Sequence, residues 1–170
     1  MQHPVTTEYG FSRTQIETTL EAINQLGLPT LWFWPNVDAG SDGTSSGIRS
    51  YREKYELKHV HFFKNMLPNC FLELLIHSSA LIGNSSVGIR ECAFLGIPVV
   101  NIGSRQNKRH RGNNVIDIDY DSDEIISAVN ACITNARPAS SEIYGRGNSG
   151  HKIAELLASV ELNYHKTITF

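Results

Sequence analysis

The stretch from Ala80 to Gly103 constrains the fold most, because its pattern predicts a buried strand, a tight turn, a helix and a second buried strand. The apolar run at residues 80–82 stops at Gly83 and Asn84, where the backbone must turn sharply. A helix is expected over about 85–95, and the strand at 98–102 should run parallel to the first. The helix start therefore lies at the carboxyl end of a strand, where α/β sheets bind ligands and free N–H groups favour phosphate oxygens.

The same alternation of strands and helices runs along the whole chain. Strands are expected at residues 29–34, 59–63, 80–82, 98–102 and 114–118, with the last part of another at 1–5. Helices are expected at residues 12–26, 44–54, 68–77, 85–95, 123–134 and 150–160. Connections are short and no pair of strands shows a hairpin signal, which predicts right-handed crossovers. The fold class is therefore α/β, a Rossmann-like, three-layer parallel sheet of about six strands.

Several local details accompany this prediction. Residues 6–11 should form a loop, and Ser12 should cap the first helix, which Gly27 closes. The continuous apolar run at 29–34 should be buried on both faces. Ser122 or Asp121 is the expected cap of the helix at 123–134. No period is visible in the tail, residues 163–170.

Length and charge limit what such a fold can do. The 170 residues, 41% of them hydrophobic, suffice for one well-packed domain, residues 1–170, and not for two large ones. The formal charge of −2 has no long run of either sign, so neither nucleic acid nor a membrane is an expected partner. Without a leader or a spanning segment, a cytoplasmic location is expected. Because the chain opens in mid-element, a preceding strand, or a whole preceding domain, is expected to be encoded elsewhere.

The cysteines and histidines give no metal site. Cys70, Cys92 and Cys132 are odd in number, widely spaced and within expected helices, so we expect reduced, buried thiols. His59 and His61 share one face of a strand at a spacing known from metal sites, but no cysteine partner is near in sequence. The expectation is no metal and no cofactor.

Candidate ligand residues cluster at the central turn. Ser85 and Ser86 could bind diphosphate oxygens or act as ordinary helix caps. Glu91 could accept hydrogen bonds from a ribose diol or be a solvated helix residue. Arg105 follows the next strand on the same rim and could neutralise phosphate charge. Other cations nearby offer the same role: Arg90, Lys108, Arg109 and Arg111.

Two positions outside the turn are less specific. Asn36, in the polar loop that also holds Asp38, could orient a ligand or simply satisfy turn backbone groups. Phe71 belongs to the apolar stripe of its helix, and packing is the more frequent role of such a residue. The dinucleotide fingerprint G-x-G-x-x-G, the phosphate loop G-x-x-x-x-G-K-[ST] and the elbow G-x-S-x-G do not occur, which argues against an NAD enzyme, an ATPase and a serine hydrolase.

Four motifs in this order carry a family resemblance: WPNVDAGS, GNSSVGIREC, GIPVVNIGSRQ and IYGRGNS. Together they resemble the C-terminal domain of UDP-N-acetylglucosamine 2-epimerases, especially the hydrolysing branch that begins sialic acid biosynthesis. The resemblance runs through nearly all 170 residues. It implies a nucleotide-sugar-binding domain that is one half of a glycosyltransferase fold B (GT-B) architecture, with substrate between it and an N-terminal Rossmann-like domain.

The resemblance also assigns roles to individual residues. Its serine turn and helix glutamate, which hold the diphosphate and ribose of UDP, correspond to Ser85, Ser86 and Glu91. An aromatic residue beside uracil corresponds to Phe71. The remaining nucleotide-binding positions are Asn36 and Arg105, and a catalytic histidine near the diphosphate falls on His3.

The reaction that the resemblance implies is loss of the C2 proton with anti elimination of UDP, followed by addition of water to give N-acetylmannosamine. The general base would lie on the N-terminal domain, so this chain alone should bind UDP weakly and be inactive. Two alternatives stay open: the donor-binding half of a GT-B glycosyltransferase, or a non-catalytic UDP-binding module. The sequence also leaves open the sugar, N-acetylglucosamine or diacetylated bacillosamine, and assembly into a homo-oligomer.

Overall fold

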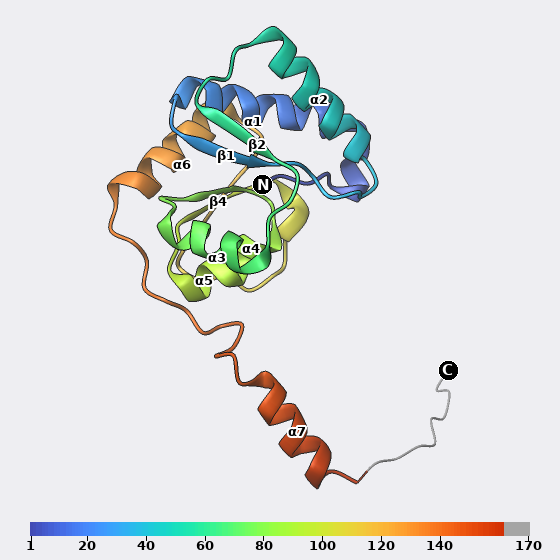
Figure 1. The fold of residues 1–170 in the computed structure, drawn as a ribbon, viewed down its shortest axis with the longest axis vertical. Helices are drawn as coiled ribbons and strands as arrows, with labels where there is room; N and C mark the ends of the chain where they lie inside the picture. Colours follow the sequence, from blue (N-terminus) through green and yellow to red (C-terminus); the bar gives the residue numbers. More distant parts are fainter. Residues whose placement is uncertain (162–170) are drawn as a thin grey trace.

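The computed structural model describes residues 1–161, and the tail at 163–170 lies outside them. Its elements alternate along the chain (Figure 1). The helices are η1 Thr6–Phe11, α1 Ser12–Leu26, α2 Ser41–Lys54, α3 Pro68–His77, α4 Ser86–Ile89, α5 Glu91–Leu95, η2 Ser104–Gln106, α6 Ser122–Thr134 and α7 Ser149–Ser159. The strands are β1 Thr30–Phe33, β2 Val60–Phe63, β3 Leu81–Gly83, β4 Val99–Ile102 and β5 Val115–Ile118.

All strand pairs within the described residues are parallel, but they form two sheets. One has the order β1-β2, and the other has the order β3-β4-β5. Thr30 lies opposite Val60 in the first sheet, and Leu81 opposite Val99 in the second. The prediction of an α/β fold with parallel strands is confirmed.

The predicted count of about six strands is wrong, because the chain forms five strands in the described part. The sixth was expected at residues 1–5, where only Met1 makes backbone hydrogen bonds to the end of β3 and the residue after it. The Met1 amine donates to the Ile82 carbonyl at 2.8 Å, and the Asn84 N–H donates to the Met1 carbonyl at 3.1 Å. Two backbone bonds along one edge are too few for a regular strand.

Helices cover both faces of the sheets, as the three-layer prediction requires. On one face, α1 packs against α2 and α6 (Figure 1). Residues of α1, β4 and α6 form one core cluster, and residues of α1, β1, α2 and β2 form a second. On the other face, α3 and α5 pack against β4. All four residues of β4 are buried, which fits a central strand covered on both faces.

Helix ends follow the capping signals with one exception. Gly27 closes α1 in the left-handed conformation, with φ of 63°, and the Asp121 carboxylate accepts the N–H groups of Asp123 and Glu124 at the start of α6. Ser12, however, is the first residue of α1 and does not cap it. Its hydroxyl donates to the Tyr9 carbonyl of η1, a 3₁₀ helix where the sequence predicted a loop. The hydrogen bond turns the chain directly from η1 into α1.

The helix expected over 85–95 is divided in two. At Arg90, φ is −103° and ψ is −71°, which ends α4 and starts α5. Ile89 and Cys92 are nevertheless buried, as expected for its inward face. The helix dipole at the start of α4 is therefore weaker than expected, because α4 is a single turn with few aligned peptide dipoles.

Two burial predictions are wrong. Leu31 in β1 is 39% exposed, so this strand is not buried on both faces. Cys70 is exposed near the start of α3, on the side away from the buried Leu75, whereas Cys92 and Cys132 are buried; all three thiols are free. Burial raises the pKa of Cys92 to about 12. In residues 1–161, we find no helix long and apolar enough to cross a membrane.

Candidate nucleotide site

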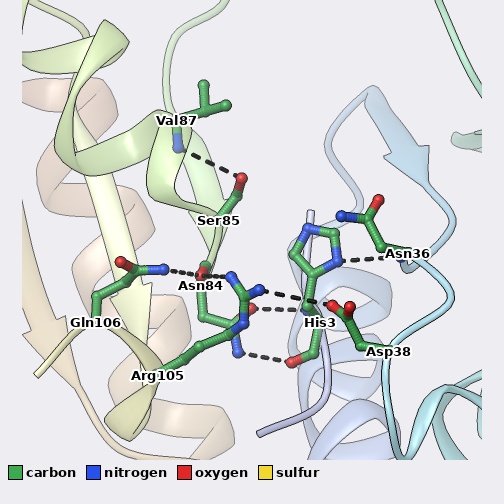
Figure 2. A network of polar contacts seen from close by, with 8 residues as sticks. All are labelled: His3, Asn36, Asp38, Asn84, Ser85, Val87, Arg105 and Gln106. Carbon is green, nitrogen blue, oxygen red and sulfur yellow. Dashed lines mark hydrogen bonds and ion pairs between the residues drawn. The ribbon is translucent and has the colours of Figure 1, made fainter.

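The Asn84 side chain, at the end of β3, holds two segments of the candidate site together. It is fully buried, and its amide pairs with the backbone of His3: Oδ1 accepts the His3 N–H at 2.7 Å and Nδ2 donates to the His3 carbonyl at 2.8 Å. The Asn84 carbonyl accepts from Gln106 Nε2 at 2.7 Å and from Arg105 Nη1 at 3.2 Å (Figure 2). One residue thus fixes both the N-terminal segment and the loop after β4.

The His3 imidazole is held in one tautomer. It is 4% exposed, and its Nδ1 accepts the backbone N–H of Asn36 at 3.1 Å (Figure 2). An accepting Nδ1 places the proton on Nε2. The pKa of His3 is lowered to about 4, mainly by burial and also by the charges of Arg105 and the N-terminal amine, while Asp38 opposes these effects. The ring is therefore neutral at pH 7 and presents an Nε2–H donor.

Arg105 lies beside His3, and its guanidinium group supplies positive charge to the candidate site. It belongs to η2, directly after β4, and its Nη2 is 3.6 Å from Asp38 Oδ2 (Figure 2). This ion pair is partly exposed, so we expect it to contribute little to stability and to be exchangeable for a ligand anion. The loop that carries Arg105 is fixed further by a hydrogen bond from the Ser104 hydroxyl to Glu8.

A polar cleft of about 690 Å³ opens beside Arg105. Its lining residues come from the N-terminal segment, the loop after β1, the start of α4 and the loop after β4: Pro4, Val5, Thr6, Thr7, Glu8, Asp38, Ser86, Ser104, Arg105, Gln106 and Arg109. Two guanidinium groups, two carboxylates and several hydroxyls thus meet in one cleft. Such a set suits an anionic ligand that also carries hydroxyl groups.

The two serines of the turn have different surroundings. Ser85 is buried and acts as the N-cap of α4, accepting the Val87 N–H at 3.4 Å (Figure 2). Ser86 lines the polar cleft. The cap role, which the sequence left open for both, belongs to Ser85.

Glu91 has one carboxylate oxygen paired and one buried without a partner in the described part of the chain. Oε1 accepts from Arg90 Nη2 at 2.9 Å, whereas Oε2 is inaccessible to solvent and has no hydrogen bond. A buried carboxylate oxygen normally has a donor. Glu91 lines neither the polar cleft nor the apolar cleft, so the ribose role that the sequence suggested for it stays a prediction.

Asn36 and Phe71 are placed differently from the other candidates. Asn36 is exposed and contacts His3 through its backbone N–H. Phe71 packs edge-on against Phe33, with ring centroids 5.3 Å apart, and lines a second, apolar cleft between the two sheets. The structure thus joins His3 and Arg105 through Asn84, places Ser86 and Arg105 in one cleft, and packs Phe71 against Phe33.

Sequence reasoning missed three polar residues of this site. Asn84 was noted only as a turn residue, although it is the hydrogen-bonding centre. Gln106 stands in the quoted motif GIPVVNIGSRQ, so that motif was the available signal. Glu8 gave no signal, because its contacts with Ser104 and Gln15 exist only in the folded chain.

We predict that His3 titrates near pH 4 in the folded chain. Its pKa is lowered from 6.5, so unfolding takes up a proton between about pH 4 and 6.5. The contribution of His3 to stability is complete above pH 6.5 and is lost as the pH falls toward 4. Imidazole NMR resonances, assigned with a His3→Gln variant, measure the titration. A folded-state pKa close to 6.5 would contradict this account of His3.

Comparison with known proteins assigns the family. A family model described as UDP-N-acetylglucosamine 2-epimerase matches residues 1–158. The chain is 32% identical over 164 residues to the UDP-N,N'-diacetylbacillosamine 2-epimerase (hydrolyzing) of Legionella pneumophila, and 29% identical over 164 residues to the UDP-N-acetylglucosamine 2-epimerase of Neisseria meningitidis. Each alignment covers 95% of this chain and 42% of the relative, so the chain spans less than half of their length.

The fold is similar to solved structures of UDP-GlcNAc 2-epimerase from Methanocaldococcus jannaschii. One matches with a TM-score of 0.66 and 15% identity, covering 92% of this chain and 44% of that one. Another, in complex with UDP-GlcNAc and UDP, matches with a TM-score of 0.63 and 17% identity, covering 86% and 41%. This likeness agrees with the predicted half of a GT-B architecture. The chain belongs to the UDP-N-acetylglucosamine 2-epimerase family.

Proposed function

We propose that this chain is the UDP-binding part of a hydrolysing UDP-N-acetylglucosamine 2-epimerase. The observation that supports this most is the joining of His3 and Arg105 through Asn84 beside a polar cleft. The hydrolysing relative from L. pneumophila supports the branch, because it is 32% identical over nearly the whole chain. N-acetylglucosamine is the sugar that the matching family model names.

In this proposal, the residues of the cleft bind the diphosphate of UDP. Arg105 exchanges its weak pairing with Asp38 for a phosphate oxygen, which carries more charge. Ser86 donates its hydroxyl to a second oxygen. The His3 Nε2–H, for which the described part of the chain gives no hydrogen-bond partner, donates to the oxygen that gains charge as UDP departs. Neutral His3 supplies a directed donor, and Arg105 supplies the charge.

Glu91 would bind the ribose. Its buried Oε2 lacks a donor in the described residues, and a ribose hydroxyl supplies one. A diol can satisfy both oxygens of one carboxylate if Oε1 releases Arg90. Glu91 thus distinguishes a nucleotide from a simple phosphate, since inorganic anions carry no such diol.

The proposed reaction begins with removal of the C2 proton and anti elimination of UDP, leaving a 2-acetamidoglycal. Addition of water then gives N-acetylmannosamine. The cleft of this chain stabilises the departing diphosphate, and the general base that removes the proton would come from the N-terminal part of the enzyme. The relatives are more than twice as long as the aligned region, which supports placing the general base outside this chain.

Two variants separate the nucleotide contacts from general anion binding. Arg105→Ala should weaken binding of both UDP and inorganic diphosphate by roughly ten- to a hundredfold, since a charged hydrogen bond is lost. Glu91→Gln should weaken UDP to a similar extent and should not weaken inorganic diphosphate. Calorimetric titration of the chain with both ligands measures this.

The control for these titrations is Arg13→Ala, which removes an exposed arginine paired with Glu17 on α1. It should leave both affinities unchanged. Equal losses for UDP and diphosphate in Glu91→Gln would refute the ribose role. Unchanged UDP affinity in Arg105→Ala would refute the proposed nucleotide site itself.

The chain on its own should not convert UDP-N-acetylglucosamine. The proposal assigns the general base to sequence outside this chain, so elimination lacks its first step. Coupled detection of released UDP measures turnover, with the full-length N. meningitidis relative, which is named for UDP-N-acetylglucosamine, as a reference protein for the assay. Steady product formation by the isolated chain would show that the base lies within residues 1–170.

A further inference from the structure

Arg109 lines the polar cleft as a second cation, together with Arg105. Arg105 is paired with Asp38, and both oxygens of the Glu8 carboxylate accept side-chain hydrogen bonds. None of the ion pairs within residues 1–161 involves Arg109, which is exposed. Arg109 can therefore bind an anion in the cleft without giving up an existing partner, whereas Arg105 must exchange one.

The loop that carries Arg109 has an unusual backbone conformation. It comprises residues 107–111, the arginine loop, and lies between η2 and β5. At Lys108 the φ angle is 65°, in the left-handed region that non-glycine residues rarely adopt, and Lys108 is the one such residue among residues 1–161. A conformation of this kind persists only where surrounding contacts fix it. The arginine loop must therefore be held by specific interactions.

The Arg111 side chain supplies two of these interactions. Its Nη1 donates to the Arg109 carbonyl at 2.6 Å, and its Nε donates to Asp117 Oδ2 at 2.6 Å. Both nitrogens belong to one planar guanidinium group, so the two acceptors are held in a fixed relative position. The backbone at Arg109 is thereby tied to β5 through Asp117.

Asp117 is itself held in place by the neighbouring strand. Asn101 of β4 lies opposite Asp117 of β5, and its Nδ2 donates to Asp117 Oδ1 at 2.6 Å. Asn101 is 1% exposed and belongs to the fully buried strand β4. Both oxygens of the Asp117 carboxylate thus have a partner. One line of contacts runs from the buried centre of the sheet to the rim of the cleft.

A second tether comes from the motif IYGRGNS near the C-terminal end. The Tyr144 hydroxyl of this motif donates to the His110 carbonyl at 2.8 Å. At the start of the loop, the Asn107 N–H donates to the Ser104 carbonyl at 2.9 Å. The backbone is therefore held on both sides of the side chain that lines the cleft.

We propose that Arg109 is a second phosphate-binding residue of the polar cleft, and that Asp117 and Arg111 are its positioning residues. This inference rests on the proposed UDP site, because it concerns the same ligand. A diphosphate has two phosphate groups, and Arg109 binds the oxygens that Arg105 leaves unpaired. The pair of Asp117 and Arg111 strengthens binding, since the arginine loop is already ordered before the ligand arrives.

The direct test is Arg109→Ala in the full chain, titrated calorimetrically with UDP and with inorganic diphosphate. Both affinities should fall by roughly tenfold, because one charged hydrogen bond is lost. The matched control is Lys108→Asn, which removes a charge from the same loop at a residue that does not line the cleft. Asparagine tolerates the left-handed conformation, so the turn is kept. The control should change either affinity by less than about twofold.

Two further variants test the positioning role. Asp117→Asn keeps an acceptor for Asn101 and removes the charge that holds Arg111. Arg111→Lys keeps the positive charge, but its single nitrogen cannot reproduce the fork that joins Asp117 to the Arg109 carbonyl. Each variant should weaken UDP binding by roughly three- to fivefold, since Arg109 is still present and only the ordering of its loop is lost.

A double-mutant cycle separates positioning from a general effect on the fold. In the Arg109→Ala background, Asp117→Asn should cause no further loss of UDP affinity, because the residue that it positions is gone. Equal losses with and without Arg109 would show that Asp117 only stabilises the fold, and the positioning role would be overturned. Unchanged affinity in both single variants, Asp117→Asn and Arg111→Lys, overturns it as well. If Asp117→Asn does not fold, the same cycle is measured with Arg111→Lys.

The outcomes for the two arginines separate this inference from the proposed function. If Arg105→Ala weakens UDP binding and Arg109→Ala does not, the UDP site stands and the second phosphate-binding residue is refuted. If neither variant weakens binding, both are refuted. If Lys108→Asn weakens binding as much as Arg109→Ala, the effect is one of net charge and the specific contact of Arg109 is overturned.

Discussion

The buried amide of Asn84 is the interaction on which the site depends. It pairs with both backbone groups of His3, and the main-chain carbonyl of the same residue accepts from Arg105 and Gln106 (Figure 2). Because the side chain and the backbone of one buried residue hold these partners, the N-terminal segment and the loop after β4 are fixed relative to each other. Two segments far apart in the sequence, 1–5 and 103–106, thereby become neighbours at the end of β3.

This arrangement divides the molecule into a polar rim and an apolar interior. The rim, with Ser86 and Arg105, lies at the carboxyl ends of β3 and β4, where parallel sheets place ligand sites. Behind it, the second cleft separates the sheets along the edges of β1 and β3. The N-terminal segment takes part in both, since Met1 lies in the apolar cleft and His3 beside the rim.

The sequence predicted the fold class and most element boundaries, because these depend on local patterns, and it singled out Ser86 and Arg105, which line the polar cleft. Alternating apolar runs and helices predicted parallel strands, and Gly27 and Asp121 marked helix ends. It failed where the outcome depends on distant contacts. The division of the helix at Arg90, the exposure of Leu31 and the central role of Asn84 follow from packing between segments that are separated in the chain. Phe71 packs edge-on against Phe33, as its helical periodicity predicted, and the uracil contact that the resemblance assigns to it stays a prediction.

The central claim is that His3, Ser86 and Arg105 form one UDP site around Asn84. The most direct measurement is a titration of the isotope-labelled chain with UDP, followed by backbone amide NMR shifts. The account predicts that the largest shifts fall on residues 3–8, 84–91 and 103–106, while α2 and α6 stay unchanged. Shifts centred on Phe71 and the apolar cleft, with the Asn84 region unaffected, would contradict it.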